Sequence, residues 1–189
     1  MIKKPTIILA SASPRRKVLL KRIVPHFKVI PSRIRESSIR AKSPLAFAVK
    51  AALAKALAVA IKQKKALVIG ADTIVVLGKK ILGKPSHKQD AYRMLKLLSG
   101  KTHQVITGVA LVDSESLQVR AGYEVTKIKM KKMRGGEIRK YVKSGLPLDK
   151  AGAYGIQEIE KIFIKEVAGD YNNVVGLPLS LVKRLLKLS

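Results

Sequence analysis

The chain has 189 residues, enough to bury a hydrophobic core, and a single domain over residues 1–189 is the expectation. Lys and Arg number 39 against 12 Asp and Glu, and the net charge of +27 favours weak, nonspecific nucleic-acid binding without identifying a partner. The absence of cysteine excludes disulfides and thiolate chemistry and fits a cytoplasmic location.

The first expected elements are a strand over Ile7–Ala10 and a helix over Pro14–Ile23. Ser13 suits the N-cap of this helix, and a proline is tolerated in its first turn because no N–H is needed there. The connecting stretch LASASPRR places two small hydroxyls and two arginines at the positive end of the helix dipole. Such a site favours an anion and suits a phosphate chain. The alternative is a capped surface helix with solvated basic residues.

A long alanine-rich helix is expected next, opening at Ser43-Pro44 and running to about Lys65. Its apolar part, Leu45–Ile61, is interrupted by Lys50 and Lys55. We therefore do not expect it to span a membrane.

The remaining patterns alternate between strand and helix, with local antiparallel pairs, which indicates the α/β class with a mixed sheet. The expected strands are Lys28–Pro31, Ala66–Leu77, Ile81-Leu82, Thr102–Val112, Leu117–Met133 and Ile162–Val167. The expected helices are Gln89–Leu98, Glu137–Lys143 and Pro178–Leu188. Gly145–Gln157 is expected to be a glycine-rich loop and Gly169–Asn173 a turn.

Asp72 is the most informative single residue, because it interrupts an otherwise apolar strand. Burying an unpaired carboxylate costs several kcal/mol, so a cation, a metal or strong donors are expected beside it. Gly70 and Ala71 are interpreted as leaving space on that side. A structural aspartate that caps a turn is the alternative. Four acidic residues are poorly explained by capping or surface positions: Glu36, Asp72, Asp149 and Asp170.

Other candidates are weaker when considered one at a time. Lys84 in GKP follows Asp72 by one short hairpin, although an ordinary turn would explain it equally well. Lys55 is one lysine among many on its helix, where solvent exposure is the usual outcome. The three histidines show neither metal-ligand spacing nor the order of a Ser–His–Asp triad.

Several segments stand in a fixed order between Ile7 and Leu179: LASASPRR, LAKA, GADTIVV, LGKP, MLKLLSGKTHQVITGVAL, YVKSGLPLDKAGAYGIQ and GDYNNVVGLPL. In this order and spacing they resemble the Maf family of nucleoside triphosphate pyrophosphatases. The most specific matches are PLDKAGAYGIQ and the combination of GADT with SPRR.

The resemblance implies hydrolysis of a nucleoside triphosphate between its α- and β-phosphates, assisted by a divalent cation, Mg²⁺ or Mn²⁺. It implies an α/β fold in which a mixed, elongated sheet and flanking helices form two lobes around a central cleft, and a homodimer. By position, Asp72 corresponds to the general base, and Glu36 and Asp72 to metal ligands. The phosphate-binding positions correspond to Ser11, Arg15, Arg16, Lys55 and Lys84.

The resemblance extends to one branch of the family. Arg15, Thr73 and Gln157 match the branch associated with dTTP and UTP. The sister branch, associated with 7-methyl-GTP, carries an aromatic residue at the Arg15 position. A glutamine amide and a threonine hydroxyl have the donors and acceptors to bind pyrimidine carbonyl and imide groups.

Three positions depart from the family pattern. Leu146 stands where an acidic residue is common, Glu158 stands where glycine usually follows IQ, and Arg35 precedes Glu36 where an acidic or small residue is expected. The last departure weakens a metal site at that loop.

Two alternative functions remain at this level. One is the same reaction on a modified purine nucleotide such as 7-methyl-GTP. The other is a basic nucleic-acid-binding or division-regulating interaction protein, because the family has been linked to inhibition of septum formation. A binding protein, however, has no need for a buried Asp72 beside convergent cations.

Overall fold

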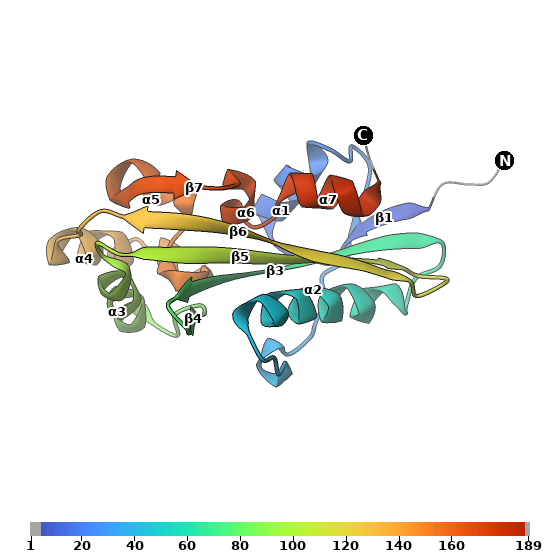
Figure 1. Cartoon of the computed structure of the whole chain (residues 1–189), viewed down its shortest axis with the longest axis horizontal. Helices are drawn as coiled ribbons and strands as arrows, with labels where there is room; N and C mark the ends of the chain where they lie inside the picture. Colours follow the sequence, from blue (N-terminus) through green and yellow to red (C-terminus); the bar gives the residue numbers. More distant parts are fainter. Residues whose placement is uncertain (1–4, 188–189) are drawn as a thin grey trace. The chain divides into compact units, whose positions relative to one another are not determined.

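A computed structural model describes residues 5–187, and within them the strands form one seven-stranded mixed sheet (Figure 1). The strand order is β2-β1-β3-β5-β6-β7, with β4 paired to β3. The strands are β1 (Thr6–Leu9), β2 (Lys28–Val29), β3 (Ala66–Leu77), β4 (Lys80–Leu82), β5 (Thr102–Asp113), β6 (Val119–Met130) and β7 (Ile164–Ala168).

Helices flank the sheet, so the predicted α/β class with a mixed sheet is confirmed. The α-helices are α1 (Pro14–Lys21), α2 (Pro44–Ala60), α3 (Lys88–Leu98), α4 (Gly135–Lys143), α5 (Ile156–Phe163), α6 (Tyr171–Val175) and α7 (Leu179–Leu186). Short 3₁₀ helices are η1 (Glu36–Ser38), η2 (Leu146–Asp149) and η3 (Ala151–Ala153). None of the helices described between residues 5 and 187 is long and apolar enough to cross a membrane.

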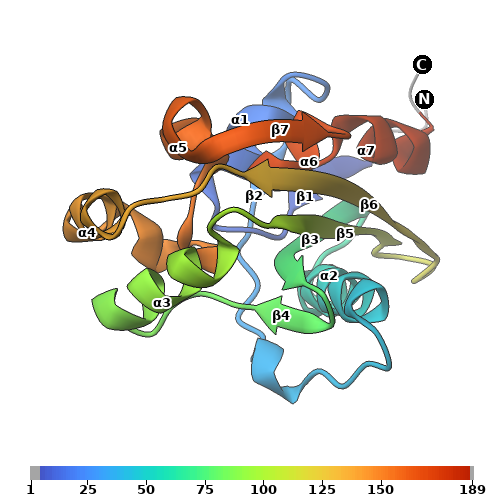
Figure 2. The same cartoon turned by 60° about the vertical axis from the view of Figure 1, so that its left-hand side comes forward.

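The pairing pattern explains where the first two helices lie. β1 pairs in parallel with β2 on one side and with β3 on the other. The crossovers that contain α1 and α2 therefore run in opposite directions across the sheet. Because such crossovers are right-handed, the two helices cover opposite faces, as Figures 1 and 2 show.

Contacts divide the chain into two compact units, each with its own hydrophobic core. Unit 1 comprises the residues up to Asp72, Thr107–Glu124 and the residues from Gly176 on. Unit 2 comprises Thr73–Ile106 and Val125–Val175.

The core of unit 1 depends on close packing of α2 against glycines in the sheet. A Cβ atom at Gly70 would lie 2.7 Å from the backbone nitrogen of Ala56, and one at Gly108 would lie 2.6 Å from that of Val49. Ala48, Ala52 and Ala56 are fully buried at a spacing of four residues, which is one stripe along the helix. The space attributed to Gly70 is therefore filled by α2, which corrects the interpretation that it lies open.

Some element boundaries differ from the predictions. α2 ends at Ala60 rather than near Lys65, which has a positive φ of 50° and immediately precedes β3. The loop predicted over Gly145–Gln157 contains η2 and η3 and ends in the first turn of α5. This last helix was not predicted, and its final turn replaces the start of the strand expected at Ile162.

The turn predicted over Gly169–Asn173 also differs from the structure, because the helix α6 begins at Tyr171. Oδ1 of Asp170 accepts a hydrogen bond from the Asn172 backbone N–H at 2.7 Å. This cap accounts for one of the four acidic residues that the sequence left unexplained. Of the C-terminal helix predicted over Pro178–Leu188, α7 supplies Leu179–Leu186, and Leu188 lies outside the described residues.

The burial of His103 predicts that the stability of unit 2 depends on pH. It is 2% exposed on β5, its Nε2 lies 2.6 Å from Oη of Tyr154, and burial lowers the pKa of His103 to about 4. Below pH ~6.5 the unfolded chain takes up a proton more readily than the folded one. The contribution of His103 to the free energy of unfolding should therefore be at its maximum above pH ~6.5. It should fall by about 3 kcal/mol as the pH drops to about 4.

Urea denaturation between pH 4 and 7 measures this effect. His103→Gln removes the titrating group, so its free energy of unfolding should vary less with pH than that of the wild type. Equal pH dependence in the two proteins would show that His103 is not the source.

Candidate active site

Asp72 and Glu36 converge on one lysine in unit 1. Lys55 Nζ lies 2.6 Å from Oδ1 of Asp72 and 2.7 Å from Oε1 of Glu36. The side chains of Asp72 and Lys55 are 6% and 12% exposed, whereas that of Glu36 is 51% exposed. The cation expected beside a buried Asp72 is therefore present, and it is Lys55.

The packing of α2 explains this arrangement. Lys55 precedes Ala56, whose backbone lies against Gly70 in β3. Two residues after Gly70, Asp72 faces the lysine. A larger residue at position 70 would push α2 off the strand, because a Cβ there already meets helix backbone. The glycine in GADT thus sets the distance between the cation and the carboxylate.

The N-terminal end of α1 adds a second group of polar side chains. Ser13 is the N-cap, with its hydroxyl accepting from the Arg16 backbone N–H, as predicted. Ser11 is 8% exposed, and its Oγ accepts hydrogen bonds of 3.2 Å from the Ser13 backbone N–H and from the Arg16 guanidinium. Nε of Arg16 also donates to the carbonyl of Gly176 at 2.8 Å. Arg15 is half-buried on the same helix turn.

Electrostatics connect this helix end to the carboxylates. Burial lowers the pKa of Arg16, the neighbouring Arg15 lowers it further, and the charges of Asp72 and Glu36 oppose that shift. An arginine stays protonated in proteins, so Arg16 remains a fixed cation. The structure thus brings five of the candidates together in unit 1: Ser11, Arg16, Glu36, Lys55 and Asp72.

This set has the composition that phosphoryl chemistry requires. Lys55 and Arg16 can neutralise phosphate oxygens, and Asp72 can accept a proton from water. Among residues 5–187 there is no group of three or more His, Cys, Asp or Glu that could hold a metal. Mg²⁺, however, is commonly bound by one or two carboxylates together with waters and substrate phosphates. Glu36 and Asp72, which both contact the Lys55 ammonium, are the two carboxylates here with the oxygen ligands that such binding uses.

Three candidates belong to unit 2. Thr73 is half-buried on β3, while Lys84 and Gln157 are exposed, the first after β4 and the second in the first turn of α5. The antiparallel register pairs Val75 with Leu82, which directs the chain at Lys84 back towards Thr73.

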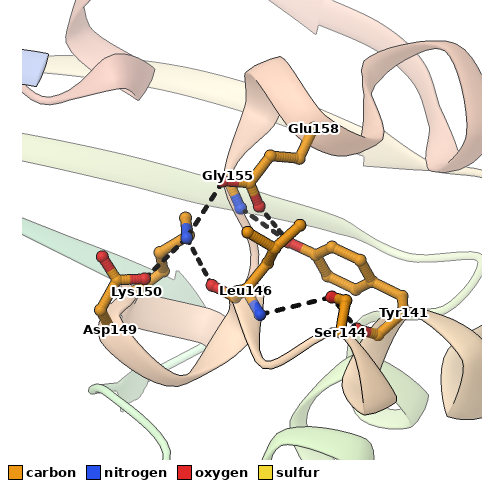
Figure 3. Close-up of polar contacts among 7 residues, drawn as sticks. All are labelled: Tyr141, Ser144, Leu146, Asp149, Lys150, Gly155 and Glu158. Carbon is orange, nitrogen blue, oxygen red and sulfur yellow. Dashed lines mark hydrogen bonds and ion pairs between the residues drawn. The ribbon is translucent and has the colours of Figure 1, made fainter.

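A buried lysine in unit 2 was not predicted from the sequence. Lys150 is 6% exposed and pairs with Asp149 and Glu158, as Figure 3 shows. This pairing also accounts for Asp149, which the sequence left unexplained. The only available signal was a lysine in a glycine- and alanine-rich loop followed by two glutamates, and that signal is weak in a chain with 39 basic residues.

Comparison with known proteins identifies the family. Residues 6–189 match the family described as Maf-like protein. The chain belongs to this family. A dTTP/UTP pyrophosphatase of Clostridium tetani is 44% identical over 183 residues, covering 95% of each chain. One of Ruminiclostridium cellulolyticum is 45% identical over 182 residues, covering 96% of this chain and 94% of the relative.

Solved structures support the fold of this family member. A Ham1 protein of Coxiella burnetii superposes with a TM-score of 0.53 at 17% identity, covering 97% of this chain and 98% of that one. The Ham1 protein of Staphylococcus aureus gives a TM-score of 0.50 at 14% identity, covering 96% and 98%. At such low identity the likeness concerns the fold alone.

Proposed function

We propose that this chain hydrolyses dTTP and UTP to the nucleoside monophosphate and pyrophosphate. The observation that carries the proposal is the buried Asp72–Lys55 pair, held beside Glu36 and Arg16 in a chain of the Maf-like family. Its relatives at 44% and 45% identity are named dTTP/UTP pyrophosphatases.

In the proposed reaction, water attacks the α-phosphorus and pyrophosphate leaves. Asp72 accepts the proton of the attacking water, for which a buried carboxylate in a fixed position is suited. Cationic and hydroxyl groups bind phosphate oxygens and neutralise the charge that develops on them. We assign this binding to Ser11, Arg15, Arg16, Lys55 and Lys84.

A divalent cation, Mg²⁺ or Mn²⁺, completes the proposed site. Glu36 and Asp72 would hold it, and it would supply charge neutralisation at the phosphates. Chelation with EDTA should then abolish pyrophosphate release, and added Mg²⁺ or Mn²⁺ should restore it.

A hydrolysis panel of nucleoside triphosphates tests the proposed function. Each nucleotide is incubated with Mg²⁺ or Mn²⁺, and pyrophosphate and orthophosphate are measured separately. The expected result is preference for dTTP and UTP, with pyrophosphate as the released product. A preference for 7-methyl-GTP, or release of orthophosphate, would contradict the proposal. Salt-sensitive polyanion binding without hydrolysis would favour an interaction protein instead.

Gln157 is the residue proposed to bind the base, together with Thr73 and Arg15. Gln157→Ala should narrow the UTP/CTP ratio of kcat/KM about tenfold. A binding site discriminates between bases because the wrong base leaves polar groups of the site without hydrogen-bond partners. The affinity for inorganic pyrophosphate, which has no base, should change little. Unchanged base selectivity in the variant would remove Gln157 from this role.

A further inference from the structure

Lys150 is the centre of a buried polar network in unit 2. Its Nζ donates to the backbone carbonyl of Leu146 and lies 2.6 Å from Oδ1 of Asp149 and 3.0 Å from Oε1 of Glu158 (Figure 3). The lysine is 6% exposed, and removing an ammonium from water costs several kcal/mol unless partners compensate. All of its partners lie between Leu146 and Glu158, so the lysine ties this segment together.

Glu158 is held at both carboxylate oxygens. Oε1 faces Lys150, and Oε2 accepts a 2.6 Å hydrogen bond from the hydroxyl of Tyr141. That hydroxyl oxygen accepts in turn from the Gly155 backbone N–H at 3.3 Å. Burial, followed by the hydrogen bond to Glu158, raises the pKa of Tyr141, so the tyrosine stays protonated and remains a donor.

The glycine at the start of α5 makes room for this ion pair. A Cβ at Gly155 would lie 2.8 Å from Cε of Lys150 and 3.0 Å from Cδ of Glu158. Gly155 is also the N-cap of α5 and contributes no side-chain cap. A carboxylate in the first turn stabilises a helix by offsetting its dipole. Glu158 occupies that turn, so the network fixes the beginning of α5.

Gln157 lies in the same turn, directly before Glu158, and is exposed. A glutamine amide has a donor end and an acceptor end, and rotating it exchanges the two. The backbone that carries the side chain limits the region its amide can reach, so a fixed backbone restricts which atoms of a base the amide can meet. Because both carboxylate oxygens of Glu158 are bound, they fix the backbone of the helix turn that also carries Gln157.

We propose that Lys150 and Glu158 are positioning residues that set base selectivity through Gln157. This inference rests on the proposed function, because it assumes that Gln157 binds the base. It adds two residues of unit 2 to those assigned to phosphate binding and proton transfer, with a different role.

Glu158→Gln in the full chain tests the proposal. The amide keeps the size of the side chain and can accept from Tyr141, but it loses the charge that faces Lys150. KM for UTP should rise about fivefold to tenfold, and the UTP/CTP ratio of kcat/KM should narrow by a similar factor. For UTP, kcat should stay within about twofold, because Asp72 and Lys55 are unaltered.

Glu160→Gln is the matched control. Glu160 lies on the same helix and also accepts from a tyrosine hydroxyl, that of Tyr171 at 3.1 Å, but it is exposed and not bound to Lys150. The base selectivity of the Glu160→Gln protein should equal that of the wild type. If Glu158→Gln unfolds the chain, Tyr141→Phe removes a single hydroxyl from the same network and should produce the same narrowing.

A double-mutant cycle separates positioning from a general structural role. In a Gln157→Ala background, Glu158→Gln should cause no further change in selectivity, because its effect acts through Gln157. An additive loss of selectivity would overturn the proposal, as would an unchanged ratio in the folded Glu158→Gln protein. The substrate preference of the wild type tests the proposed function independently of this inference. If the wild type does not prefer dTTP and UTP, the proposed function itself is wrong.

Discussion

Replacing Asp72 by Asn should lower kcat for UTP by about 10²- to 10⁴-fold, the usual contribution of a general base. Loss of a metal ligand at the same position would add to this. The chain should stay folded, because an asparagine oxygen can still accept the 2.6 Å hydrogen bond from Lys55. The lysine also keeps Glu36 as a charged partner. Nucleotide binding should persist, since the proposed phosphate-binding cations are unchanged.

Steady-state kinetics with UTP, thermal unfolding and nucleotide titration measure the three expectations. Asp113→Asn is the matched control. Its carboxylate accepts 2.9 Å bonds from the Glu115 and Ser116 backbone N–H groups in a surface turn, which an asparagine can also do. The control should retain turnover within about twofold. Near-normal turnover in a folded Asp72→Asn protein would show that another group accepts the proton.

The sequence predicted the fold best where its pattern was strong. β3 has the predicted bounds, because a continuous apolar run between turns leaves little choice. Ser13 caps α1 as expected, since a hydroxyl before a proline is a strong local signal. The helix α5 was missed, although Ile156, Ile159 and Phe163 are buried at helical spacing. It is only eight residues long, and its C-terminal end merges with a β-branched run that favours a strand.

The candidate site was only partly predictable for a similar reason. Asp72 was evident because a carboxylate in an apolar strand requires compensation. Its partner could not be chosen by spacing, since Lys55 resembles every other lysine on a helix. What selects it is the approach of α2 to Gly70, a tertiary contact. Lys150 was hidden for the same reason, because its burial depends on contacts with Glu158 across a loop.

Lys55→Met should be the most damaging change among the cations, lowering kcat/KM for UTP by about 10²- to 10³-fold. Lys55 is one of the proposed phosphate-binding cations, and its removal also leaves Asp72 and Glu36 facing each other without their shared cation. Arg16→Ala and Lys84→Ala should also lower kcat/KM, by smaller factors. Lys129→Met is the control, because Lys129 is exposed on β6. Equal effects at all four positions would mean that the charge of +27 acts only as a diffuse field.

A second measurement on Lys55→Met tests whether a divalent cation binds to Glu36 and Asp72. A divalent cation held by Glu36 and Asp72, as proposed, would compete with Lys55 for the same two carboxylates in the wild type. Mg²⁺ should therefore raise the unfolding temperature of the wild type only slightly. Without the lysine, Asp72 and Glu36 repel each other, and Mg²⁺ relieves that repulsion by binding the folded state alone. The increase in unfolding temperature caused by Mg²⁺ should therefore be larger in Lys55→Met than in the wild type or in Lys129→Met. An equal increase in all three proteins would place the divalent cation away from Glu36 and Asp72.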